Sequence, residues 1–186
     1  MAERILQDIA KQKKRLTIAK INKDTEEEAH AYYNLGNAYY SLSDFHQAIE
    51  CNKKSLSIFK EIGDRKREGC LYGNLGCAYS SLCDFQRAKK HHKQHLSIAK
   101  EVGNKACEGK AYGGLGDAYE SLSEFQQAIE YHKKSLSIAQ EIGNRQGEGR
   151  AYGNLALVYH SLSEFQQAIE YQEKSCLLYT SPSPRD

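Results

Sequence analysis

One pattern constrains this chain more than any other: a similar block of sequence returns every 40 residues, without insertions. The blocks open with "AYYNLGNAYYSLSDF" at Ala31, "LYGNLGCAYSSLCDF" at Leu71, "AYGGLGDAYESLSEF" at Ala111 and "AYGNLALVYHSLSEF" at Ala151. A fixed period of this size is the signature of repeat architectures, in which each unit packs mainly on its neighbours. We therefore expect a linear array of units and not a fold built around one central core.

Each block has the periodicity of two helices. Tyr112, Leu115 and Tyr119 lie three and four residues apart, which places them on one face of a helix, and a second stripe of the same kind begins at Phe125. No proline precedes Pro182, so nothing removes a backbone donor from these helices. The pattern predicts an all-α chain with helices at 2–22, 25–42, 44–62, 65–82, 84–102, 105–122, 124–142, 145–162 and 164–179.

Helix ends can be read from small and polar residues. Each second helix should stop at a glycine in the left-handed conformation, followed by a residue that caps the next helix. The pairs that fit this description are Gly63 with Asp64, Gly103 with Asn104, and Gly143 with Asn144. Between the two helices of a block, Ser123 with Gln126 and Ser163 with Gln166 predict serine-capped second helices.

Glycines also occur inside the first helices, where glycine costs about 1 kcal/mol relative to alanine. Their recurrence at one repeat position predicts a close approach between the two helices of a block. We expect the facing positions to be small as well. The glycines are Gly36, Gly76 and Gly116, and the facing residues are predicted to be Ala48, Ala88 and Ala128, with Ala168 in the fourth block.

The motif "YNLGNAYYSLSDFHQAIE" resembles the tetratricopeptide repeat: Leu-Gly-x-x-Tyr is followed nine residues later by alanine, with phenylalanine three before it. The usual repeat has about 34 residues. The longer form, with "GEGRAYGNL", is similar to Pins-type G-protein-signalling modulators and the tetratricopeptide repeat protein 28 group. The resemblance implies a right-handed superhelical solenoid of antiparallel helix pairs, whose first helices line the concave side.

The repeat phase divides the chain into segments. "KKRLTIAKI" near the N-terminus matches "KKSLSIFKEI" one period later, so the chain is expected to open with the second helix of an incomplete repeat. The other end, "CLLYTSPSPRD", translates the mosaic end and read adapter of transposase-based sequencing libraries, so we interpret it as a scar and expect the natural protein to continue. The predicted segments are a half-repeat helix (1–28), repeat 1 (29–68), repeat 2 (69–108), repeat 3 (109–148), truncated repeat 4 (149–175) and the scar (176–186).

Composition excludes several classes of function. The net charge of +2 gives no global attraction to nucleic acid or anionic lipid. No apolar run is long enough for a membrane span, and the N-terminus lacks a signal peptide. The six cysteines form no C-x-x-C pair, so we expect reduced thiols and a cytoplasmic protein. Phosphate-loop, zinc-protease and nucleophile-elbow motifs are absent, so we expect neither an enzyme nor a cofactor.

A histidine cluster, "KKHHKQHL", is the one metal-like feature. His91 and His95 lie one helical turn apart, but a metal site needs three or four ligands. The equivalent residues in repeat 3 are Tyr131 and Ser135, so we interpret the histidines as surface variation and expect no metal.

The stripe of each first helix opposite its buried face is free to line a groove. Asparagine amides there can both donate to and accept from a peptide backbone. In the tetratricopeptide family such a ladder holds a peptide, and Asn34, Asn74 and Asn154 match it, whereas Gly114 interrupts it; the alternative is that these are ordinary solvated asparagines. Asn74 is expected to be exposed and to have no structural partner. The residues predicted to bind a peptide are Asn34, Asn37, Asn74, Lys110, Asp117, Arg150 and Asn154.

These features predict a protein-interaction scaffold whose ligand is a protein or peptide, in cytoplasmic signalling linked to G proteins or the cell cortex if the narrower resemblance holds. RNA is not expected, because Lys110 and Arg150 are the only basic residues at their groove position. Two alternatives remain: a self-assembly module that associates through the open ends of the solenoid, or a regulatory arm of a larger multidomain protein.

Overall fold

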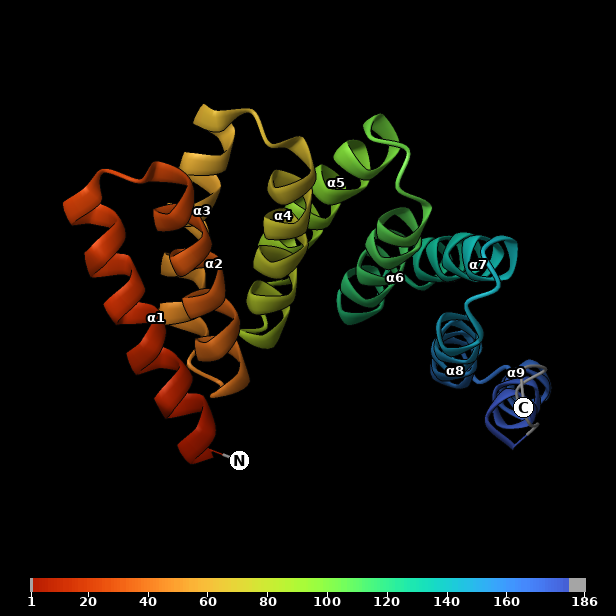
Figure 1. The fold of residues 1–186 in the computed structure, drawn as a ribbon. Helices are drawn as coiled ribbons and strands as arrows, with labels where there is room; N and C mark the ends of the chain where they lie inside the picture. Colours follow the sequence, from red (N-terminus) through yellow and green to blue (C-terminus); the bar gives the residue numbers. More distant parts are fainter. Residues whose placement is uncertain (1, 181–186) are drawn as a thin grey trace. The chain divides into compact units, whose positions relative to one another are not determined.

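The computed structural model describes residues 2–180, and this part of the chain consists of helices joined by short turns, with no strand (Figure 1). The helices are α1 (Ala2–Asn22), α2 (Thr25–Ser41), α3 (Phe45–Ile62), α4 (Arg65–Ser81), α5 (Phe85–Glu101), α6 (Lys105–Ser121), α7 (Phe125–Glu141), α8 (Arg145–Ser161) and α9 (Phe165–Thr180). The all-α prediction is confirmed, and no helix end differs from the predicted one by more than one residue.

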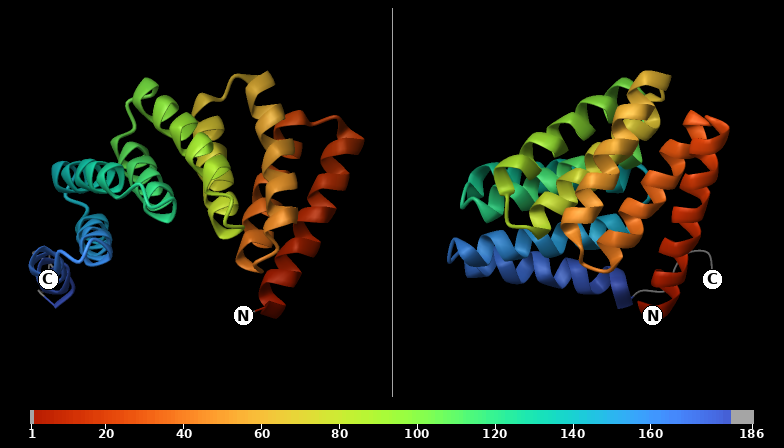
Figure 2. Two further views of the ribbon diagram at one scale, coloured as in Figure 1. Left: turned by 180° about the vertical axis from the view of Figure 1, so that it is seen from behind. Right: turned by 90° about the vertical axis from the view of Figure 1, so that its left-hand side faces the viewer.

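The chain divides into two compact units, with the boundary between Ile98 and Ala99 near the end of α5. In the first unit α2 packs between α1 and α3, and α3 also packs on α4 (Figure 2). In the second unit α7 packs between α6 and α8, and α8 also packs on α9. We call α2, α4, α6 and α8 the first helices, and the helix that follows each of them its second helix. Each repeat is thus an antiparallel pair of a first and a second helix.

The glycine ends of the second helices are confirmed. Gly63, Gly103 and Gly143 have φ angles of 81°, 67° and 66°, in the left-handed region that glycine adopts without a steric penalty. The residue after each glycine caps the next helix, as predicted: Asp64 accepts from the amide of Arg67 at 3.0 Å. Asn104 and Asn144 do the same for α6 and α8.

The predicted serine caps of the second helices are wrong. Ser123 and Ser163 have φ angles of 59° and 60°, so each terminates the preceding helix in the left-handed conformation and cannot act as an N-cap. The cap lies one residue later, where Asp44 accepts from the amide of Gln47 at 3.2 Å. Glu124 occupies this position before α7 without a side-chain cap bond. Ser123 and Glu124 are adjacent polar residues, and the geometry of the tight turn decides which of them takes the N-cap position of α7.

The close approach of paired helices is confirmed, but its partner is not alanine. A Cβ atom at Gly116 would overlap the imidazole ring of His132, which projects from α7. The equivalent glycines Gly36 and Gly76 face Asn52 and His92 in the same way. A bulky polar side chain of the second helix therefore fills the space that the missing side chain leaves.

Further contacts recur at the period of the repeat. Ser55 on α3 donates to the carbonyl oxygen of Ala29 on α2 at 2.8 Å, and Ser135 and Ser175 make the same bond within their own pairs. The ring of Tyr119 stacks on that of Tyr131 with centroids 5.1 Å apart. In repeats 3 and 4 the serine bond and a stacked tyrosine pair both connect the first helix to its second helix.

Gly116→Ala should destabilise the chain, because overpacking of a filled site costs about 1–3 kcal/mol. Combining it with His132→Gln should restore most of the loss, because Ala156 and Gln172 occupy these positions in the fourth repeat. Urea denaturation followed by circular dichroism measures both. Gly113→Ala is the control: its Cβ would lie 3.5 Å from Ser135 Oγ, so helix propensity should make it neutral or stabilising. A harmless Gly116→Ala would contradict the packing argument.

Candidate peptide-binding surface

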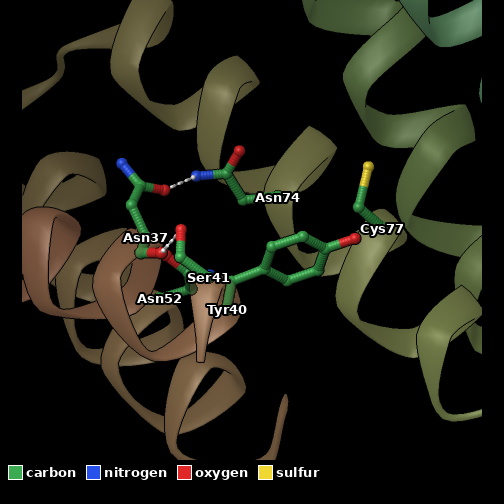
Figure 3. Close-up of a pocket in the computed structure, with 6 residues that line it drawn as sticks. All are labelled: Asn37, Tyr40, Ser41, Asn52, Asn74 and Cys77. Atoms are coloured by element: carbon green, nitrogen blue, oxygen red, sulfur yellow. Dashed lines mark hydrogen bonds between the residues drawn. The ribbon is translucent and has the colours of Figure 1, made fainter. Parts of the chain in front are cut away.

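The first unit has a cavity between α2 and α4, on the face that the sequence predicts to bind a peptide. Its volume is about 270 Å³. We call it the α2–α4 cavity (Figure 3). It is lined by Asn37, Tyr40, Ser41, Asn52, Asn74 and Cys77.

Neighbouring first helices are joined at this surface by a bond between two side-chain amides. Asn74 Nδ2 donates to Asn37 Oδ1 at 2.9 Å (Figure 3). Tyr40 Oη and Ser81 Oγ lie 3.2 Å apart and form a second link between the same helices. The prediction that Asn74 has no structural partner is wrong: it is half-buried and paired, because the spacing of adjacent first helices puts two amides within reach.

The second unit has the equivalent bond, but its acceptor is a carboxylate and not an amide. Asn154 Nδ2 on α8 donates to Asp117 Oδ1 on α6 at 2.8 Å, at positions equivalent to those of Asn74 and Asn37. Asn34 makes a longer contact, 3.4 Å, with Gln12 Oε1 on α1. The predicted asparagine ladder therefore takes part in bonds between neighbouring helices of each unit.

The buried floor of the α2–α4 cavity is Asn52, which comes from the second helix. Its side chain is 1% exposed, and its Oδ1 atom has no hydrogen-bond partner. An unpaired buried polar atom costs about 1–3 kcal/mol, so a donor supplied by a ligand would be favourable here. Sequence reasoning missed Asn52 because it searched only the exposed stripe of the first helices. Asn52 occupies the position that His132 has in repeat 3, so the repeat alignment itself shows that this position of the second helix is polar.

The predicted basic residues belong to the second unit and do not line the α2–α4 cavity. Lys110 on α6 and Arg150 on α8 line a small recess of the second unit together with Ser135. The structure thus pairs Asn37 with Asn74, and Asp117 with Asn154, in separate units.

The pKa of Asp117 is raised above its usual value, chiefly because surrounding protein removes water from the carboxylate. His132 and Arg150 oppose this shift by attraction, and Glu120 adds to it by repulsion. His132 lies beneath the carboxylates, with Nε2 3.9 Å from Asp117 Oδ1 and 3.8 Å from Glu120 Oε2.

The histidine cluster is not surface variation, and that interpretation is wrong. His92 and His95 are 4% and 6% exposed, and the ring of His91 stacks on Tyr79 at 5.2 Å and 1°. Burial lowers the pKa of both His91 and His92 to about 4, so both are neutral packing groups at pH 7. Among residues 2–180, no three side chains of metal-binding type are arranged to hold an ion.

Helix pairs packed in series, with interhelical amide bonds on the first helices, define a helical-repeat module of the protein-binding class. The tetratricopeptide repeat model matches residues 27–101 and 108–181, so the chain belongs to the tetratricopeptide-repeat family. The predicted all-α solenoid of antiparallel helix pairs is thereby confirmed. The narrower resemblance to Pins-type modulators and the protein 28 group is not supported by these comparisons, and a comparison with curated proteins gave no match.

Several solved structures share this fold. Kinesin light chain nearly identical TPR-like repeats from Podosopora anserina match with a TM-score of 0.79 and 16% identity, over 94% of this chain and 86% of theirs. Aspartyl phosphate phosphatase F from Bacillus subtilis matches with a TM-score of 0.84 and 18% identity, over 94% and 48%. A Rap protein complexed with Competence and Sporulation Factor matches with a TM-score of 0.79 and 18% identity, over 95% of this chain and 50% of that protein.

The chain spans about half the length of the phosphatase and of the Rap protein, so these likenesses show the fold alone. The family that matches is a repeat module and not a catalytic family. None of the helices between residues 2 and 180 combines the length and apolar character needed to cross a bilayer.

Stability should fall as the pH is lowered from 6.5 towards 4. An unfolded histidine takes up a proton near pH 6.5, whereas folded His92 stays neutral down to about 4, so the unfolded chain binds more protons in this window. His92→Asn, which installs the residue of repeat 1, should flatten the slope by up to about 1.4 kcal/mol per pH unit. Urea titrations from pH 4.5 to 7.5 measure it. His46→Asn, at an exposed position, is the control, and an unchanged slope in His92→Asn would contradict the assignment.

Proposed function

We propose that this chain is a protein-interaction scaffold whose first helices bind a peptide segment of a partner protein. The observation that carries the proposal is the α2–α4 cavity, whose buried acceptor, Asn52 Oδ1, has no partner. The amide pair of Asn37 and Asn74 lies at its rim and keeps free donor and acceptor capacity, because each amide can make more bonds than the one they share. A peptide backbone offers the matching groups.

The neighbouring structures are consistent with this proposal. One of them is a Rap protein in complex with Competence and Sporulation Factor, so a protein that contains this fold forms a complex with a separate molecule. Repeat length is the support for the narrower proposal that this scaffold acts in cytoplasmic, G-protein-linked or cortical signalling. Asn34 and Asn154 extend the proposed surface beyond the cavity, and Lys110 and Arg150 would contact acidic groups of the peptide.

The double variant Asn37→Ala with Asn74→Ala should weaken peptide binding by at least about fivefold. Each amide left unpaired in a complex costs about 1–3 kcal/mol, and the substitutions remove two of the groups that a peptide backbone would use. The probes are peptides selected on the intact chain from a random displayed library, and calorimetry measures their affinity.

Gln94→Ala is the matched control, because it removes an exposed amide of α5 that does not line the α2–α4 cavity. Thermal melts should show a loss below about 1 kcal/mol for each variant, since only exposed or half-buried groups change. If the double variant binds the selected peptides as tightly as the parent, the proposed surface is wrong.

A second candidate function is association through α9, and its exposed apolar face favours it. Phe165 and Ile169 are 56% and 54% exposed. The equivalent of Ile169 in α7, Ile129, is 8% exposed in a unit where α8 packs on α7. In this alternative a second copy of the chain covers the face of α9 that corresponds to the buried face of α7.

Under this alternative the chain should dimerise at micromolar concentration, and Phe165→Ser with Ile169→Ser should return it to a monomer. The reason is that burying two large apolar side chains contributes about 3–6 kcal/mol. Sedimentation equilibrium over a hundredfold range of concentration measures the effect. A parent chain that stays monomeric throughout that range would exclude this alternative.

A further inference from the structure

The two units present different chemistry at equivalent positions of their first helices. In the first unit Asn37 and Tyr40 lie above buried Asn52, and all three are neutral. Two repeats later these positions hold Asp117, Glu120 and His132. The second unit therefore has two carboxylates where the first unit has none.

We infer that these carboxylates form a subsite for a cationic side chain, an arginine in particular, of the partner peptide. The inference rests on the proposed function and names the partner's chemistry at the second unit. We call Asp117, Glu120 and His132, with Asn154, the acidic subsite. A guanidinium carries several donors in one plane and can bond to two carboxylates at once.

His132 is the observation that points to a ligand beyond the acidic residues themselves. Its side chain is 0% exposed, and neither ring nitrogen has a hydrogen-bond partner. Nε2 is directed at the two carboxylates, but distances of 3.8 and 3.9 Å are too long for hydrogen bonds. Because Gly116 has no side chain, the ring packs directly against the backbone of α6 at this position. Bonding capacity thus remains unused at the floor of the acidic subsite.

The remaining contacts position the carboxylates for a cation. Asn154 bonds to Asp117 Oδ1 and holds the carboxylate in place, while Oδ2 has no bond to Asn154. Asp117 is 58% exposed and Glu120 is 26% exposed, so a ligand can reach both. Arg150 attracts Asp117 and offsets part of its charge, but one positive charge against two negative ones leaves the subsite acidic.

Because Asp117 is more than half exposed, water screens part of its charge, so the second carboxylate, that of Glu120, is needed to hold a cation. A metal ion is a poorer candidate than an organic cation, because the described residues contain no group of three ligands in metal-binding geometry.

The test uses the intact chain and two small probes, N-acetyl-arginine amide and N-acetyl-citrulline amide, which have nearly the same shape but differ in charge. Nuclear magnetic resonance titration should show saturable shifts of the Asp117, Glu120 and Asn154 amides and of the His132 ring protons with the arginine probe. The citrulline probe should bind at least fivefold more weakly. The amides of Asn37 and Tyr40 in the first unit are the internal reference and should not respond.

Glu120→Gln should weaken the arginine response at least fivefold, and Asp117→Asn should do so independently, while circular dichroism shows that both remain helical. Glu173→Gln, an exposed charge-matched control on α9, should leave it unchanged. Equal binding of the two probes, or an arginine response that survives Glu120→Gln, would overturn the inference. If this happens while Asn37→Ala with Asn74→Ala still weakens selected peptides, only the acidic subsite is wrong. The reverse result would reject the peptide surface of the first unit instead.

Discussion

The absence of a side chain at one position of the first helix is the constraint on which the first three repeats depend. Gly36, Gly76 and Gly116 accept a polar side chain of the paired helix into the space where a Cβ atom would lie. Glycine lowers helix propensity by about 1 kcal/mol, so the helix tolerates it only where packing compensates. The packing in turn fixes the distance between the two helices and places a buried polar group of the second helix against the first helix.

This contact links stability to surface chemistry. Asn52 and His132 are core residues by burial, yet each lies directly beneath the face proposed to bind a ligand. Their unpaired atoms are unfavourable in the free chain, because a buried polar group without a partner loses the bond that it made to water. A ligand that supplies the missing bond would recover that loss, which is why buried residues of the second helices belong to the proposed site.

Sequence periodicity predicted the helices almost to the residue, because the stripes of tyrosine and leucine repeat without insertion and proline is absent until Pro182. The prediction failed where local geometry decides which of two adjacent residues ends one helix and which caps the next. Ser123 was predicted as a cap but ends the preceding helix, since only the completed turn shows which residue must be left-handed. His92 was taken for a surface residue, because a repeat pattern identifies equivalent positions but not the depth at which they lie.

The same reasoning explains how much of the site was predictable. Asn37 and Asn74 were found because they lie on the stripe opposite the buried face, but their mutual bond depends on the spacing of two helices that no sequence motif encodes. That spacing is fixed by the packing and does not depend on the exposed residue itself. The position of Asn37 can therefore hold aspartate in repeat 3 without a change in the interhelical bond, which Asn154 still donates. A repeat built this way keeps its interhelical bond while the side chains on the proposed binding face change, so under the proposed function the units would differ in specificity without a change of backbone.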